Sequence, residues 1–275
     1  MSGSVISSGM FGLQNAKTAL DISVKSWFAI ALVGQWAFAL YVFFIYALTL
    51  AFGVDITDIS PASGVRETEG FDRVVFFSHI VPSVYLSLFG LFQLVPAIRN
   101  RFRGFHRWNG RLFLVLGLCG ALTGLYLQWI KGLNFSQGVT VNGLLILLAV
   151  AATWYYAVNR RFDLHMRWAV HTFILVNGVW SFRLYLMGWY LVNQGPNGNT
   201  PNVNGPMDVF LSFACYLIPM AIAELYFWVK RQRHNHKVWA ATTVMTIGAL
   251  ITLIGVFAAI TMMWTPRIAK VLTVI

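Results

Sequence analysis

Long apolar stretches alternate with short polar segments along the whole chain of 275 residues. A helix of about 20 apolar residues crosses the hydrocarbon core of a bilayer, and seven of these stretches are long enough to do so. The expected spans are residues 27–52, 74–98, 112–130, 139–158, 168–192, 208–229 and 238–264. The pattern therefore predicts an all-α fold: a polytopic membrane helix bundle of seven transmembrane helices. Residues 27–275 are expected to form this single membrane domain, and residues 1–26 a loosely ordered, amphipathic N-terminal arm.

The charged residues set the expected orientation of these spans. Only 11% of the residues are charged and 58% are hydrophobic, yet the net charge is +11. Of the 20 Lys and Arg residues, 12 lie in three short loops, at 99–111, 160–167 and 230–237, which follow the second, fourth and sixth spans. Basic loops stay on the cytoplasmic side. We therefore expect a cytoplasmic N-terminus and an outside C-terminus in a bacterial inner membrane, with the lipid bilayer rather than nucleic acid as the partner.

Two junctions between loop and span have a similar composition. The segment from His106 to Arg111 reads His-Arg-Trp-Asn-Gly-Arg, and His165 is followed three residues later by Trp168. With His79 and Arg183, these motifs resemble a bacterial family of predicted multi-pass membrane proteins, domain of unknown function 2306, over about residues 74–186. The resemblance implies a bundle of spans with shared polar positions, and the family brings no established activity. His171 departs from it, because an Arg is expected there.

An ionisable residue inside a span is a candidate for function because its burial in lipid is unfavourable. Near the cytoplasmic ends of the spans lie His106, Arg111, His165, Arg167, His171 and Glu224. One hypothesis is a b-type heme between the third and fifth spans. His106 or His165 would pair with His171 as iron ligands, and Arg111 or Arg167 would hold the propionates. No other metal site is indicated.

Structural explanations for the same residues stay open. His106 and Arg111 would then only fix the orientation of their helix at the membrane boundary. Glu224 is the only acidic residue well inside a span, and we expect its partner to be Arg167, His171 or Arg111.

A second polar layer lies in the outer half of the bundle. His79 is one to two turns into the second span, and Arg183 is about 22 Å along the fifth. They are candidates for a ligand site that holds either a quinone or a small anionic or polar molecule. A contact between Arg183 and Asp208, or between Arg183 and a carbonyl group, is the structural alternative.

Three functions follow from these layers. The first is electron transfer linked to b heme or quinone, and the second is non-enzymatic ligand binding or transport at the His79 and Arg183 layer. The third is an accessory role beside other membrane subunits. Transporters usually show internal repeats or helices broken in mid-membrane, and the sequence predicts neither here. The sequence assigns no reaction.

Overall fold

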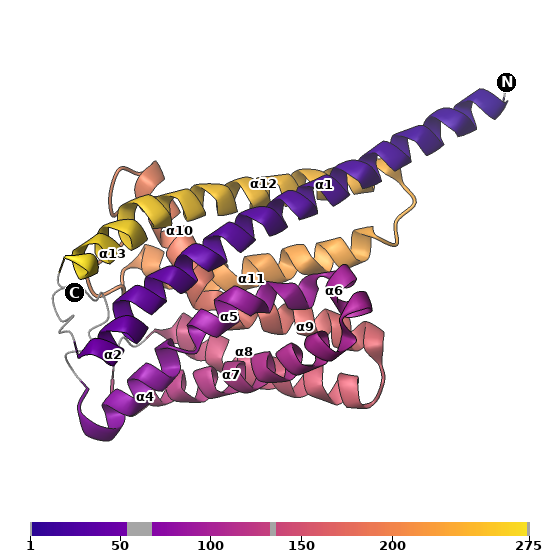
Figure 1. Ribbon diagram of the computed structural model, residues 1–275. Coiled ribbons are helices and arrows are strands. Elements are labelled where there is room, and N and C mark those ends of the chain that lie inside the picture. The colour runs from indigo at the N-terminus through magenta and orange to yellow at the C-terminus, as the bar shows by residue number, and fades with distance from the viewer. Residues whose placement is uncertain (1, 54–67, 133–135, 274–275) are drawn as a thin grey trace.

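The computed structural model describes residues 2–53, 68–132 and 136–273, with side chains omitted at 2–11 and 49–50. Within these ranges the chain is helical and contains no strand, as the apolar pattern predicts. The helices form an elongated bundle, with the N-terminal end of α1 projecting beyond it and the C-terminus at the opposite end (Figure 1).

The first part of the chain, up to Arg101, contains one long helix followed by several short ones. They are α1 (Ser2–Val42), the π-helix η1 (Phe43–Leu48), α2 (Thr49–Phe52), α4 (Gly70–Ile80), α5 (Ser83–Phe89), the 3-10 helix η2 (Gly90–Leu94) and α6 (Pro96–Arg101). Those after it are α7 (Arg103–Trp129), α8 (Gln137–Val158), α9 (Phe162–Val176), α10 (Gly178–Val192), α11 (Pro206–Val229), α12 (Asn235–Ala259), the π-helix η3 (Ile260–Trp264) and α13 (Thr265–Leu272).

Among the described residues, six helical stretches are long and apolar enough to cross a membrane. They are Gly12–Leu48, Gly70–Leu94, Arg103–Trp129, Gln137–Val158, Pro206–Val229 and Asn235–Leu272. Each contains one of the expected spans for most of its length. The fifth expected span is absent from this set because it is divided between α9 and α10, each of 15 residues.

The N-terminal segment differs from the loosely ordered arm that we expected. Residues 2–26 are helical and continuous with the first span, so no boundary separates the arm from the bundle. Ala16 and Leu20 are buried against α11 and α12. The hydroxyl of Ser23 lies 2.8 Å from that of Thr246 on α12. These positions recur every three to four residues, and this spacing places one face of the arm on the bundle.

The second and fifth spans are interrupted, contrary to the prediction of unbroken helices. Pro82 cannot donate a backbone hydrogen bond, and α4 ends just before it. In the fifth span α9 stops at Asn177, whose amide Nδ2 donates to Phe173 O (2.8 Å). Backbone hydrogen bonds from Asn177 to Phe173 and from Ser181 to Asn177 still join the two halves, so α10 continues the path of α9. At the break the side-chain amide of Asn177 adds a hydrogen bond to Phe173 O beside the backbone bond, a feature that sequence periodicity does not reveal.

Candidate functional site

Arg183 lies on α10, in the layer where the sequence predicts a ligand site. Its Nη1 donates to Val179 O at 3.2 Å, and its Cζ lies 5.4 Å from the ring centre of Phe38 on α1. Of the two structural alternatives, the contact with a carbonyl group is formed, at Val179 O, and the contact with Asp208 is not. Asp208 instead accepts hydrogen bonds from Asn199, Thr200 and Gly205 at the start of α11. The guanidinium therefore has no carboxylate partner among the described residues.

Phe38 belongs to a group of rings that we call the outer aromatic cluster: Phe38, Tyr41, Tyr46, Phe76 and Trp264. Ring centres in this cluster are 5.6 Å apart for Phe38 and Trp264, and 6.2 Å apart for Tyr41 and Trp264. Tyr41 and Tyr46 follow at 6.5 Å, and Tyr46 and Phe76 at 6.3 Å. The cluster thus connects Arg183 on one side with α4 on the other. Its members come from α1, η1, α4 and η3.

Three hydrogen-bonding groups in this region are buried and have no partner among the residues that the structure describes. The hydroxyl of Tyr41 and the indole Nε1 atoms of Trp180 and Trp264 make no hydrogen bond, and these residues are 0%, 6% and 1% exposed. An indole N–H can only donate. A buried donor without an acceptor is unfavourable by about 1–3 kcal/mol, so each of these groups suits an acceptor atom brought by a ligand.

Both π-helical segments of the described chain adjoin the outer aromatic cluster. η1 contributes Tyr46, and η3 contributes Trp264. Wider π-helical turns are rare, and they are often found at functional sites because they redirect side chains within a helix. Here η1 redirects the end of the first span and η3 the end of the last span, so that Tyr46 and Trp264 face the same core.

His79 is held firmly by α7. Its Nδ1 lies 2.9 Å from Gly120 O and 3.1 Å from Thr123 Oγ1, and because a carbonyl oxygen only accepts, Nδ1 carries the proton. A Cβ atom added to Gly124 would lie 2.9 Å from His79 Cε1, so the imidazole occupies the space that this glycine leaves. Nε2 is then the unprotonated nitrogen, and no described residue donates to it. Arg183 lies close enough for its positive charge to act on the imidazole of His79.

The inner layer contains the predicted partner of Glu224. Its carboxylate accepts hydrogen bonds from Nε (2.7 Å) and Nη2 of Arg167, and its Oε1 lies 2.6 Å from His171 Nε2. The expectation that Arg167 or His171 would pair with Glu224 is confirmed. His171 is 7% exposed, and no described residue is a hydrogen-bond partner of its Nδ1. The hydrogen bonds to Glu224 direct the side chains of Arg167 and His171 towards α11.

The other inner histidines hydrogen-bond to different elements. His165 Nδ1 lies 3.0 Å from Thr153 O on α8. In the orientation that satisfies its amide, Gln93 donates to His106 Nδ1 (3.1 Å). Arg111 is exposed and, five residues after His106, lies about 140° around α7 from it.

These contacts bear on the expected heme ligands and on their arginine partners. His171 Nε2 contacts Glu224. His106 Nδ1 accepts a hydrogen bond, so the proton of the neutral His106 ring lies on Nε2. His165 retains an unprotonated Nε2, and a neutral His171 that donates from Nε2 to Glu224 retains an unprotonated Nδ1, so either residue could coordinate iron. Arg167 is paired with Glu224, and Arg111 lies away from His106. The expected heme ligands thus hydrogen-bond to different elements, and heme binding stays a prediction.

Sequence reasoning missed the polar centre of the bundle and the outer donors. Gln35 Nε2 donates to Asn177 Oδ1 at 2.9 Å, and Asn142 Nδ2 donates to Leu175 O at 3.1 Å beside the break in the fifth span. Uncharged amides within spans are a usable signal that we did not weigh. Tyr41 and Trp264 gave no such signal, since aromatic residues are common in every span.

The fold, with its apolar helices and polar layers, defines a multi-pass integral membrane protein. The chain belongs to the family described as predicted membrane protein (DUF2306), whose model matches residues 76–228. The matched region runs from α4 to α11, and it includes His79, Arg183 and the Glu224 network. It leaves out α1 and α12. No curated protein and no solved structure matches the chain.

Proposed function

We propose that this protein binds a quinone headgroup in the outer half of the bundle, between Arg183, the outer aromatic cluster and His79. The buried donors without acceptors at Tyr41, Trp180 and Trp264 carry this proposal. A quinone ring is planar and offers two carbonyl oxygens that only accept hydrogen bonds. The site complements both properties, because it combines unsatisfied donors with stacked aromatic faces.

Each polar residue has a distinct role in this proposal. Arg183 makes one hydrogen bond to Val179 O, so its other N–H groups remain for a quinone oxygen. His79 would accept a proton at Nε2, since Gly120 O fixes the proton of the neutral ring on Nδ1. Reduction of a quinone to the quinol consumes two electrons and two protons, and His79 would pass each proton from the aqueous phase to a quinone oxygen through Nε2. The electron donor would be another redox protein of the membrane.

The proposal includes the orientation predicted by the basic loops. The segment from α9 to α10 would form a seventh crossing, with the N-terminus in the cytoplasm of a bacterium and the C-terminus outside the inner membrane. The opposite positions of the two ends support an odd number of crossings (Figure 1). A reporter enzyme that is active only outside the cytoplasm, fused after Ile275, should be active. An inactive but stably produced fusion would contradict this orientation.

The binding proposal is tested by titrating the purified full chain with decylubiquinone while tryptophan fluorescence is followed. The Tyr41→Phe variant removes one donor and should weaken the dissociation constant about tenfold, the effect of losing roughly 1.4 kcal/mol. Arg183→Gln should weaken it at least as much. Tyr155→Phe is the matched control, because Tyr155 is exposed on α8. Absence of saturable quenching, or equal loss in Tyr155→Phe, would overturn the proposal.

The second candidate is binding or transport of a small anion at the same layer. It is favoured by the lack of a carboxylate partner for Arg183 and by the interruptions in the second and fifth spans, a feature of many transporters. Succinate and sulfate in the same titration separate the two functions. An anion that binds where decylubiquinone does not would favour transport.

Heme b remains a prediction, tested by the visible absorption spectrum of the oxidised and dithionite-reduced protein.

A further inference from the structure

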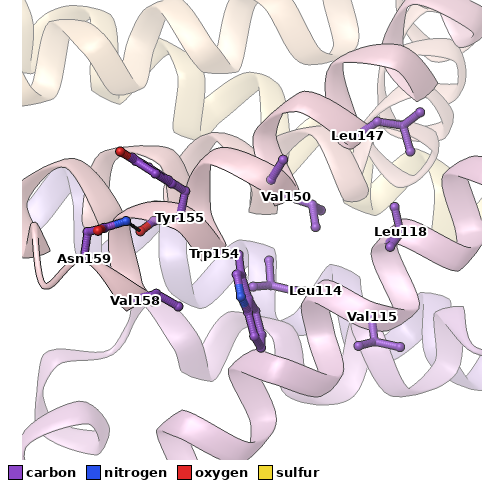
Figure 2. A pocket seen from close by; sticks show the side chains of 10 residues that line it. Leu114, Val115, Leu118, Leu147, Val150, Trp154, Tyr155, Val158 and Asn159 are labelled. Carbon is purple, nitrogen blue, oxygen red and sulfur yellow. Dashed lines mark hydrogen bonds between the residues drawn. The ribbon is translucent and has the colours of Figure 1, made fainter.

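An apolar groove follows the outer surface of α7 and α8, away from the site described above. It has a volume of about 500 Å³. Figure 2 shows its lining, which begins with Leu118 and Leu147 at one end and reaches Tyr155 and Asn159 at the other. Val115, Trp154 and other lining residues are exposed in the described chain, so the groove opens towards the lipid.

The depth of the groove corresponds to one leaflet of the membrane. Twelve residues of helix separate Leu147 from Asn159, a rise of about 18 Å. Half of a hydrocarbon core of about 30 Å is about 15 Å. The groove therefore extends from the basic-loop side of the bundle to roughly the middle of the membrane, the region that one acyl chain occupies.

Positive charge gathers at the end marked by Asn159. Arg160 and Arg161 follow this residue directly, and both are exposed. Arg160 has φ of 57°, the left-handed conformation that turns the chain between α8 and α9. Arg111 is exposed on α7, three and four positions before Leu114 and Val115, and so lies on the face of α7 that forms the groove wall.

The geometry points to a binding site for an anionic glycerophospholipid of the inner leaflet. One acyl chain lies in the groove between Leu147 and Tyr155, and the phosphate contacts the cluster of Arg111, Arg160 and Arg161. An apolar channel with a basic end complements such a lipid along its whole length. The zwitterionic lipids lack the net negative charge that this end selects. The site is separate from the quinone site, and each can fail without the other.

The test is native mass spectrometry of the full chain in detergent, with equal amounts of dioleoylphosphatidylglycerol and dioleoylphosphatidylcholine. We expect phosphatidylglycerol to be retained preferentially. Arg111→Gln should reduce this preference about fivefold, the effect of one basic side chain near an anionic lipid. Ala151→Trp fills the groove from an exposed position and should reduce retention of both lipids.

Two control variants separate this site from general lipid contact. Arg101→Gln removes an exposed arginine of α6, and Leu250→Trp adds bulk at an exposed position of α12. Both should behave as the unmodified chain. Equal retention of the two lipids by the unmodified chain would overturn the inference. So would a loss in Leu250→Trp equal to that in Ala151→Trp, or a dimer that Ala151→Trp separates, since the groove would then receive a second copy.

Discussion

The imidazole Nε2 of His171 lies 2.6 Å from Oε1 of Glu224, and Arg167 binds the same carboxylate from one turn earlier on α9. The network joins α9 to α11 with one acid and two nitrogen-containing side chains. The side chains of such a pair stay together mainly because separating them leaves a lone charge in the membrane, which is unfavourable, and less because of their net attraction. Removal of the carboxylate should therefore be more harmful than removal of the pair.

Glu224→Gln should lower the free energy of unfolding by about 1–2 kcal/mol, because Arg167 loses its counter-charge. The double variant with Arg167→Gln should recover part of this loss, so the two effects would not add. Unfolding in mixed micelles measures both. The control is Asp21→Asn, which breaks the exposed ion pair with Lys25 and should change stability by at most about 0.5 kcal/mol. Additive effects at Glu224 and Arg167 would argue against a coupled network.

The buried amides at the break in the fifth span allow a sharper test. Asn177→Leu leaves the 1%-exposed amide of Gln35 without its acceptor and should reduce the free energy of unfolding by about 1–3 kcal/mol. Adding Gln35→Leu replaces both polar partners with apolar groups, which is close to neutral when the shapes match. The double variant should thus be more stable than Asn177→Leu alone. If it is less stable, the contact between the two amides is not what holds α1 to this break.

One ion pair at the outer end of the second span gives an expected pH dependence. Lys131 Nζ lies 2.5 Å from Asp72 Oδ2, and this hydrogen bond raises the pKa of the Lys131 ammonium above its ordinary value. A raised pKa means that the folded state holds the proton more tightly. The stabilisation is therefore complete below the pKa of the unfolded chain and is lost as the pH rises through the raised value.

Thermal unfolding of the unmodified chain and of Lys131→Gln measures this contribution. The difference in stability should be constant around neutral pH. It should shrink in the strongly alkaline range, where Lys131 loses its proton, and in strongly acidic solution, where Asp72, whose pKa this contact lowers, gains one. A difference that disappears on acidification from neutral pH to mildly acidic pH would assign it to another group.

The apolar stretches predicted the helical class because lipid requires backbone groups to be satisfied within each segment. Because Glu224 is the only acidic residue well inside a span, the sequence likewise predicted that it would pair with a basic residue at its own depth. The interruption at Asn177 could not be placed from periodicity, since it depends on which amide or carbonyl lies on the next helix, whereas Pro82 itself marks the interruption of the second span. The predicted inner residues lie at similar depths along their spans. Depth does not fix the direction in which a residue faces around its helix, and His171 and His106 point to different helices.

Two glycines of α7 provide the closest control for the outer site. A Cβ at Gly124 would lie 2.9 Å from His79 Cε1, whereas a Cβ at Gly120 meets no atom within 4 Å. Gly124→Ala should displace the imidazole and should lower stability by about 1–3 kcal/mol, the usual effect of overpacking. Gly120→Ala should be neutral or stabilising by up to about 1 kcal/mol, because alanine loses less backbone entropy in a helix.

The same pair separates the role of His79 from mere packing. If His79 Nε2 takes part in ligand binding, Gly124→Ala should weaken decylubiquinone binding about tenfold and Gly120→Ala should leave it unchanged. The two substitutions add the same methyl group, one turn apart on one helix, so a general effect on α7 would change both. Weakened binding in Gly120→Ala as well would show that the ligand senses α7 itself. Unchanged binding in Gly124→Ala, with reduced stability, would remove His79 from the site and leave Arg183 and the aromatic donors as its only polar contacts.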